Sequence, residues 1–181
     1  MHADPSLQIE APEADAAEGE IESLSEILRA CVHDGASVSF ILPFEIEEAA
    51  RFWRDRVLPA VAEGRRRLFV ARWDGRVVGT AQLDLDTPPN QAHRAEVSKL
   101  LVDPSARRRG IARALMLAVE AAARAQGLSL LTLDTRTGDA AEPLYLSLGF
   151  QLAGRIPAYA RAPAGDELQA TSVMFKRLDG I

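Results

Sequence analysis

The sequence predicts an α/β fold, or α+β by strict classification, with helices on both faces of one mixed sheet. Short apolar runs typical of strands alternate with runs whose apolar residues recur every three or four positions, as in an amphipathic helix. The runs 95–102 and 128–134 are separated by such a helical segment, and strands joined by a helical crossover are usually parallel. With 181 residues, 48% of them hydrophobic, the chain is long enough for one full core and short for two domains. We therefore expect residues 1–20 to be a flexible N-terminal segment with a first strand at 6–11, and residues 21–181 to form a single domain.

The remaining elements follow from periodicity and from turn residues. Asp74-Gly75 between two apolar runs is a strong hairpin signal, and Pro59 should kink the last turn of the helix that contains it. Pro157 and Pro163 are expected in the loop between the last two strands. In chain order, we expect helices at 21–33 and 45–63, strands at 67–72, 77–85 and 95–102, a helix at 111–127, a strand at 128–134, a helix at 139–148, and strands at 150–156 and 171–175.

The stretch 95–127 combines a strand, a turn at Asp103-Pro104 and a helix that starts in a cluster of arginines. The first turn of a helix has N–H groups without intrahelical partners, and the helix dipole adds partial positive charge there, so an anion is stabilised at that end. Gly110 allows backbone to approach a ligand closely, and guanidinium groups suit phosphate. We interpret this junction as a site for a diphosphate, against the alternative of a solvated basic helix start. The chain contains neither GxxxxGK[ST] nor GxGxxG, which removes the strongest signals for nucleoside-triphosphate and dinucleotide loops.

The pattern R107-x-x-G110-x-A112 after a strand resembles the acetyl-CoA signature of the GCN5-related N-acetyltransferases (GNAT family). The segments VHDGASVSF, RAEVSKLLVDPSARRRG, LTLDT and AEPLYLSLGF resemble the tabtoxin-resistance type of that family. The resemblance implies the GNAT acyl-CoA N-acyltransferase fold, in which two parallel strands of the mixed central sheet splay apart, and acetyl-CoA as cosubstrate. It also implies acetyl transfer to the amine of a small molecule, with an amino-acid-like antimetabolite or antibiotic as one candidate. The expected cofactor-binding residues are Leu101, Val102, Arg107, Arg108, Arg109, Gly110, Ile111, Ala112, Arg113 and Asp139.

Acetyl transfer to an amine requires a base for the nitrogen and a proton for the leaving thiolate. Glu96 and Asp134 lie on the two predicted neighbouring strands and are candidates for base or amine ligand, although each is also compatible with a strand-end carboxylate paired to arginine. The resemblance implies that Tyr145 is the general acid, because it matches the family's tyrosine in that role. The alternative is that Tyr145 is an aromatic residue of the core. His33 falls in a segment like the subgroup's and is a candidate substrate residue, against a helix-end histidine. Where many relatives have Asn seven residues before the tyrosine, this chain has Gly138, which calls the pantetheine contacts there into question; Asp139 is a partial substitute.

Composition narrows the classes of function. A net charge of −5 and a pI near 5.3 argue against nucleic-acid binding, and a single cysteine excludes an intrachain disulfide framework. We expect no metal, no membrane span and no secretory signal, and so a cytoplasmic enzyme. A homodimer stays open because relatives often dimerise. Two other functions also stay open: acetylation of a protein N-terminus or lysine, and a non-catalytic acyl-CoA-binding module.

Overall fold

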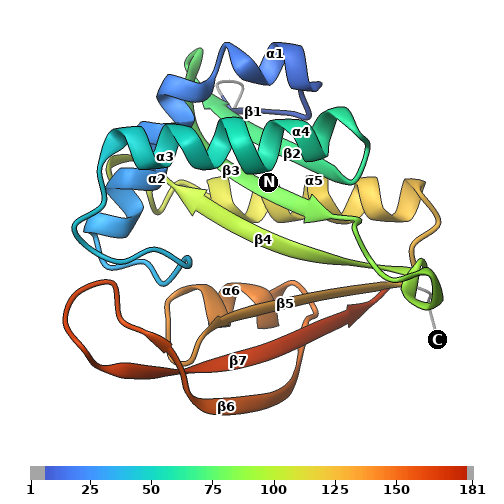
Figure 1. Ribbon diagram of the computed structural model, residues 1–181. Coiled ribbons are helices and arrows are strands. Elements are labelled where there is room, and N and C mark those ends of the chain that lie inside the picture. The colour runs from blue at the N-terminus through green and yellow to red at the C-terminus, as the bar shows by residue number, and fades with distance from the viewer. Residues whose placement is uncertain (1–6, 179–181) are drawn as a thin grey trace.

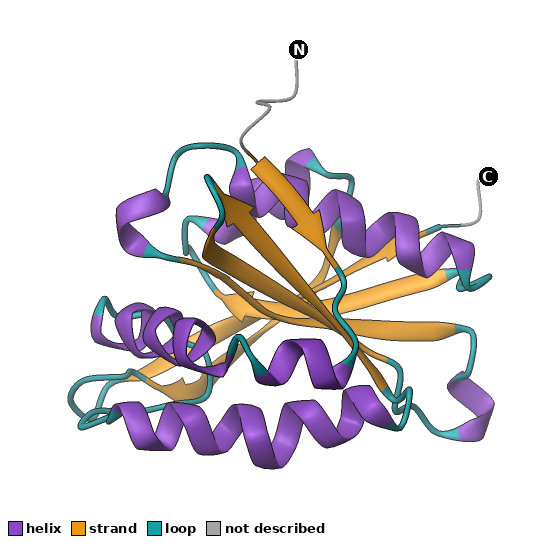
Figure 2. Cartoon of the chain, turned by 90° about the horizontal axis from the view of Figure 1, so that it is seen from above, coloured by secondary structure: helices purple, strands orange, loops and turns teal. Residues whose placement is uncertain are grey.

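A computed structural model describes residues 7–178 and contains one seven-stranded mixed sheet with helices on both faces (Figures 1 and 2). The strand order is β1-β2-β3-β4-β5-β7-β6. The predicted fold class is thereby confirmed. The strands are β1 Leu7–Glu10, β2 Arg66–Trp73, β3 Arg76–Asp84, β4 Arg94–Val102, β5 Leu130–Arg136, β6 Gln151–Arg161 and β7 Leu168–Arg177. The helices are α1 Ala14–Glu18, α2 Ile21–His33, α3 Ile46–Phe52, α4 Leu58–Ala62, α5 Ile111–Ala125 and α6 Ala141–Ser147, with a π-helical turn η1 Trp53–Val57 and 3₁₀ turns η2 Pro89–Gln91 and η3 Pro104–Ala106.

The part of the N-terminal segment that the structure describes is integrated into the fold. β1 pairs antiparallel with β2 through Leu7↔Trp73 and Ile9↔Ala71, and Ala17 of α1 is fully buried. The predicted first strand is thus present, although Ser6 lies outside the described residues. For the acidic residues 11–20 the sequence leaves open an exposed connection or a frayed helix start, and the structure has a short helix there whose Ala17 is buried.

The long helix predicted at 45–63 consists of three consecutive helical pieces, α3, η1 and α4. Glu45 and Glu48 form a reciprocal capping box at its start. Pro59 has no N–H to donate to the preceding turn, and directly before it the helix widens into η1, where the N–H of Leu58 donates to the carbonyl of Trp53. The irregularity therefore begins one turn earlier than the kink that we predicted.

The hairpin prediction at Asp74-Gly75 is confirmed, because β2 and β3 pair antiparallel across it and both turn residues have positive φ (50° and 79°). The last two strands are longer than predicted. Pro157 lies inside β6 and not in the loop, which corrects our expectation. β6 is an edge strand, and its register shifts between Ile156 and Ala160, so the missing N–H breaks no regular ladder bond.

β4 and β5 are parallel neighbours that separate along their length (Figure 1). They pair only through Arg94↔Leu130, Ala95↔Leu131 and Glu96↔Thr132. Beyond that point β4 stays with β3 and β5 stays with β7, as far as Val102 and Arg136. The predicted splay is therefore present, and it opens the sheet toward the C-terminal ends of both strands.

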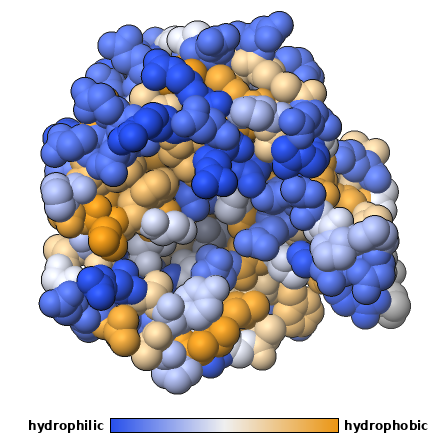
Figure 3. Space-filling model, viewed as in Figure 1, coloured by the Kyte–Doolittle hydropathy of each residue, from blue (hydrophilic) through white to orange (hydrophobic). Residues whose placement is uncertain are grey.

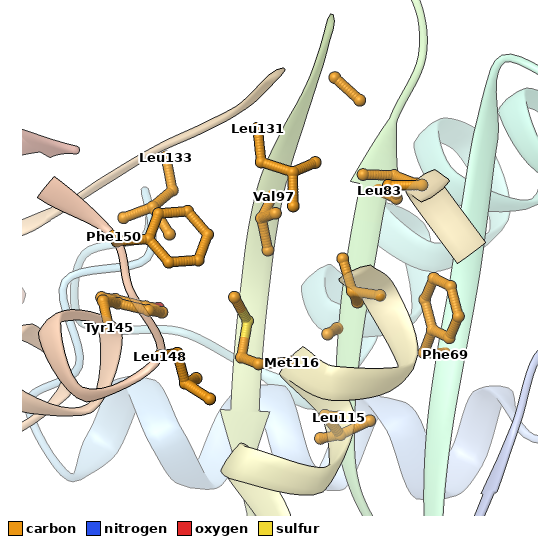
Figure 4. Packing of buried hydrophobic residues seen from close by; sticks show 14 of the residues in the cluster. Phe69, Leu83, Val97, Leu115, Met116, Leu131, Leu133, Tyr145, Leu148 and Phe150 are labelled. Carbon is orange, nitrogen blue, oxygen red and sulfur yellow. The ribbon is translucent and has the colours of Figure 1, made fainter. Parts of the chain in front are cut away.

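Two apolar layers hold the sheet. One is formed by α5 and α6 against the sheet, where Leu115, Met116, Leu131 and Phe150 pack together (Figure 4). The other lies under α2, α3 and η1, with Trp53 completely buried. Gly79 of β3 has a specific role in the first layer, because a Cβ there would lie 2.9 Å from the carbonyl oxygen of Leu101 and 3.2 Å from Ile111. Its lack of a side chain lets the start of α5 pack directly on the sheet.

Candidate active site

A pocket of about 420 Å³ lies where β4 and β5 part. It is bounded by the end of α2, the end of β4, the loop before α5, the first turn of α5 and the start of α6. In the space-filling view, which is seen from the side opposite α5, the surface is hollowed near its centre, with hydrophilic residues around the hollow (Figure 3). The lining includes nine of the ten predicted cofactor-binding residues, namely Leu101, Val102, Arg107, Arg108, Gly110, Ile111, Ala112, Arg113 and Asp139.

The first turn of α5 opens into this pocket. Gly110 occupies the N-cap position with φ 79°, and no side chain caps the helix, so the N–H groups of the first turn remain available for a ligand. Two residues earlier, Arg108 also has a left-handed φ of 66°. Left-handed backbone at a non-glycine residue is uncommon and is concentrated at functional loops. Helix dipole, free N–H groups and guanidinium side chains fit a diphosphate.

The arginines of the predicted cluster separate in the structure. Arg107 pairs with Asp34 at the end of α2, and Arg113 donates to Ser147 of α6 at 2.6 Å, so both tie neighbouring elements together at the pocket. Arg109 does not line the pocket; its guanidinium lies over the ring of Trp73, 5.3 Å from the centroid. Consecutive residues of a loop point to different sides, and the sequence pattern alone does not say which side faces the ligand.

Arg136 is a pocket residue that our sequence reasoning missed. It lies at the end of β5, donates to the carbonyl oxygen of Gly35 at 2.9 Å and pairs with Asp139 at 3.2 Å. The signal available in the sequence was its place directly after LTLDT, at the end of the strand that splays from β4. Arg136 thus joins α2 to the loop before α6 across the mouth of the pocket.

The loop before α6, which contains Gly138, is held by Glu142. The N–H of Gly138 donates to Glu142 at 2.9 Å, and Arg155 donates to the same carboxylate at 3.0 Å. These two donors hold the pKa of Glu142 below its usual range. Gly138 has φ 80°, and Asp139 next to it lines the pocket.

Cys31, the one cysteine of the chain, lies in the pocket wall. Its Sγ contacts the carbonyl oxygen of Val102 at 3.4 Å, and burial raises the pKa of the thiol. A buried thiol with a raised pKa is a poor nucleophile, so Cys31 contributes to the pocket wall by packing.

Glu96 and Asp134 lie on β4 and β5, at the start of the splay and on the sheet face opposite Val97 and Leu133, which belong to the core layer of α5. Desolvation by the surrounding protein raises the pKa of Glu96, and the negative charges of Asp134 and then Asp84 raise it further. Asp134 accepts a hydrogen bond from the hydroxyl of Thr171 at 3.1 Å. The two acids are thus brought together, and neither makes an ion pair among residues 7–178.

Tyr145 lies in α6 and is not part of the pocket lining, although Ala141 and Leu144 of the same helix are. Its ring packs beside Phe150 with centroids 5.8 Å apart, and 6% of the residue is exposed (Figure 4). Burial raises the pKa of its hydroxyl above the usual value, and the charges of Asp139 and Asp134 raise it further. The group is therefore protonated at neutral pH, and of the two acids at the splay Asp134 acts on it electrostatically.

His33 does not line the pocket. It ends α2, and its Nε2 donates to the carbonyl oxygen of Phe44 at 2.9 Å, which ties the α2–α3 connection back to the helix. This geometry matches the helix-end alternative considered for it above. Within residues 7–178, no group of three or more His, Cys, Asp or Glu side chains has the arrangement of a metal site. None of the helices in this range has the length and apolarity of a membrane span.

Comparison with known proteins gives the family. The model of the acetyltransferase (GNAT) family matches residues 22–150. An N-acetyltransferase encoded in the hisH–hisA intergenic region of Azospirillum brasilense is 36% identical over 128 residues, which cover 69% of this chain and 73% of the relative. An IAA acetyltransferase of the same organism is 36% identical over 107 residues, 59% of this chain and 68% of that protein.

Solved structures share the fold. An N-acetyltransferase from Staphylococcus aureus Mu50 superposes with a TM-score of 0.79 at 20% identity, covering 96% of this chain and 99% of that one. The acetyltransferase yncA from Salmonella typhimurium, solved with its cofactor acetyl-CoA, gives 0.76 at 19% identity, covering 96% and 95%. The chain belongs to the GNAT family of acetyltransferases and is an acetyl-CoA-dependent N-acetyltransferase, as the sequence predicted.

Proposed function

We propose that this enzyme acetylates the amine of a small molecule by direct attack of the amine on the thioester. The observation that carries the proposal is the splay of β4 and β5, since the basic pocket and the acids Glu96 and Asp134 meet at the same opening. Acetyl-CoA supplies an activated acetyl group and a thiolate leaving group. The roles of the chain's own residues follow from their positions around that opening.

The diphosphate of the cosubstrate is assigned to the first turn of α5. Gly110, Ile111 and Ala112 offer backbone at the helix start, and Arg108 and Arg113 offer guanidinium groups from the same wall. Leu101 and Val102 offer the unpaired edge of β4 to the amide-rich arm, much as an added strand would use it. An N–H in this part of β4 is suited to stabilise the oxyanion of the tetrahedral intermediate.

Glu96 and Asp134 are assigned to the acceptor amine, one as base and one as ligand. An amine with a pKa of about 10 is only about a thousandth neutral at pH 7, so a carboxylate that accepts its proton, directly or through water, accelerates attack. The raised pKa of Glu96 makes it a stronger base than an ordinary carboxylate. Tyr145 is assigned as the acid that protonates the leaving thiolate, because it matches the family's general acid in the sequence resemblance and lies in α6, of which Ala141 and Leu144 line the pocket.

A small acceptor is supported by the connections that flank the splay. The N–H of Leu42, in the α2–α3 connection, donates to the carbonyl oxygen of Pro163, in the β6–β7 connection, at 2.8 Å. Both connections lie at the end of the sheet where β4 and β5 diverge (Figure 1). The hydrogen bond between Leu42 and Pro163 joins the two connections, and this leaves less space for a polypeptide acceptor to reach the opening. The sequence resemblance to the tabtoxin-resistance type, whose acceptor is a small amino-acid-like toxin, supports the same choice.

The test is a thiol-release assay with acetyl-CoA and a panel of small amines, amino acids and peptides, followed by mass spectrometry of the products. We expect N-acetylated small amines, with peptides acetylated much more slowly. Turnover of peptides in preference to all small amines would assign a protein acceptor. Tight CoA binding without turnover on any amine would assign a non-catalytic module.

A further inference from the structure

β4 contains a bulge at the opening. The pairs Gln82↔Ser98 and Thr80↔Leu101 place two residues of β4, Lys99 and Leu100, opposite one residue of β3. Lys99 has φ 50°. A left-handed conformation is strained at a residue with a Cβ, so glycine would be the unstrained choice here. Lys99 thus has a long side chain at a strained backbone position. Leu100, the next residue, lines the cofactor pocket.

Lysine is rare in this chain. Of its 21 basic residues only Lys99 and Lys176 are lysines, and all others are arginines. Lys176 is fully engaged, with Glu120 at 2.5 Å and the carbonyl oxygen of Leu148 at 2.6 Å. Among residues 7–178, Lys99 has no carboxylate within ion-pair distance. Its Nζ lies 3.5 Å from the hydroxyl of Ser39 and 5.8 Å from the centroid of the Phe52 ring.

The other charges around Lys99 are the acids of the opening and a paired arginine. Burial and then the charge of Arg66 lower the pKa of Lys99, while Asp134 and Glu96 act in the opposite direction, so both acids lie within its electrostatic reach. Arg66 is already paired with Asp84 and also donates to Gln82 at 2.9 Å. Glu96 precedes Lys99 by three positions on one strand, a span of about 10 Å or less. The opening thus contains two carboxylates, Glu96 and Asp134, that can bind the ammonium group of a substrate. A short distance away it contains the ammonium group of Lys99, which has no anionic partner among residues 7–178.

We propose that Lys99 binds a carboxylate of the acceptor, so that the substrate of this enzyme carries an amine and a carboxylate in the same small molecule. The inference rests on the proposed function and adds a residue that determines specificity. Phe52 supports the ammonium through its ring face, and Ser39 supplies a second polar contact. The carboxylate of the acceptor provides the negatively charged partner that Lys99 lacks, while Glu96 and Asp134 bind the amine.

The experiment compares kcat/KM for free amino acids and for the corresponding amino-acid amides, in which the carboxylate is a neutral carboxamide. It is done with the wild type and with Lys99→Met, Lys99→Arg and Lys176→Met. The amide removes the negative charge and also alters the reactivity of the amine, but that intrinsic difference cancels when the acid-to-amide ratio of a variant is divided by that of the wild type. A lost charged hydrogen bond corresponds to about tenfold or more. We therefore expect Lys99→Met to lower the ratio by about tenfold or more through slower reaction of the acids, and Lys99→Arg to retain most of it.

Lys176→Met, the same substitution at the other lysine, should keep the wild-type ratio whatever it does to stability. CoA affinity measured on each variant verifies that the cofactor pocket is intact. An unchanged ratio in Lys99→Met, or an equal loss on acids and amides, would overturn the proposal. Acetylation of Lys99 itself, detected by peptide mass spectrometry after incubation with acetyl-CoA, would also overturn it, because the residue would then be an acceptor. Failure of the wild type to acetylate any amine would instead refute the proposed function.

Discussion

The two sides of the opening between β4 and β5 are built in different ways. The proposed cofactor side comes largely from one continuous stretch, the end of β4, the loop and the first turn of α5, and its charged groups are mainly guanidiniums. The proposed acceptor side is assembled from the α2–α3 connection, α3, β4 with its bulge, β5 and the β6–β7 connection, and it mixes acids, an ammonium and aromatic rings. The first side suits a ligand part that is always the same, a diphosphate. The second suits a variable acceptor, because each contributing segment can change independently.

The largest effect is expected at Tyr145 of α6, the helix that contributes Ala141 and Leu144 to the pocket. Tyr145→Phe removes the proposed acid and should lower kcat by about 10²-fold or more. Since no hydrogen bond of this hydroxyl is found within residues 7–178, the substitution should leave the stability nearly unchanged. Steady-state kinetics with thermal unfolding and CoA calorimetry on the same preparation provide the measurement. Undiminished turnover would remove Tyr145 from the reaction.

The cofactor side is tested by Gly110→Glu, which places a negative charge and a side chain at the N-cap of α5. We expect CoA to bind about tenfold more weakly or worse, as measured by calorimetry. Gly165→Glu is a matched control, because Gly165 has the same φ of 79° and, as at Gly110, a Cβ added there would meet no neighbouring atom within 4 Å. The control carries the same backbone strain outside the pocket lining and should bind CoA normally. Equal CoA affinity in both variants would contradict the assignment of the diphosphate to this helix.

The same contrast explains which parts were predictable from sequence. The segment from Leu101 to Arg113 is local, so turn residues, helix periodicity and the arginine cluster were sufficient to place it, and only the direction of Arg109 was hidden. The proposed role of Lys99 could not be predicted from the sequence, because it depends on a bulge that arises from pairing with β3. Arg136 and the Leu42–Pro163 bridge depend on contacts between distant segments, which spacing in a sequence does not encode. Periodicity also failed at Pro157, where the edge position of β6 tolerates a residue that a central strand would exclude.

A smaller effect, a shift in pH dependence, separates the roles of the two acids. If Glu96 is the base, it acts only when deprotonated, so kcat/KM rises with pH through its pKa, which lies above the ordinary value. Asp134→Asn removes a negative charge that raises this pKa, and the rising limb should therefore move to lower pH. Glu96→Gln should abolish the limb. If Asp134 is the base instead, Asp134→Asn loses the limb and Glu96→Gln keeps one.

The smallest effect is expected for His33→Ala, which tests whether the acceptor side reaches as far as the end of α2. The ring donates to the carbonyl of Phe44, and the loss of one such hydrogen bond should lower the free energy of unfolding by about 1 kcal/mol. The KM for the acceptor should stay unchanged, because the Nε2 of the ring is already engaged by the carbonyl oxygen of Phe44 and is not free to bind a substrate. His33→Gln can still donate to the same carbonyl and should recover most of the stability. A raised acceptor KM with unchanged stability would instead make His33 a substrate residue, and the acceptor side would then extend along the whole α2–α3 connection.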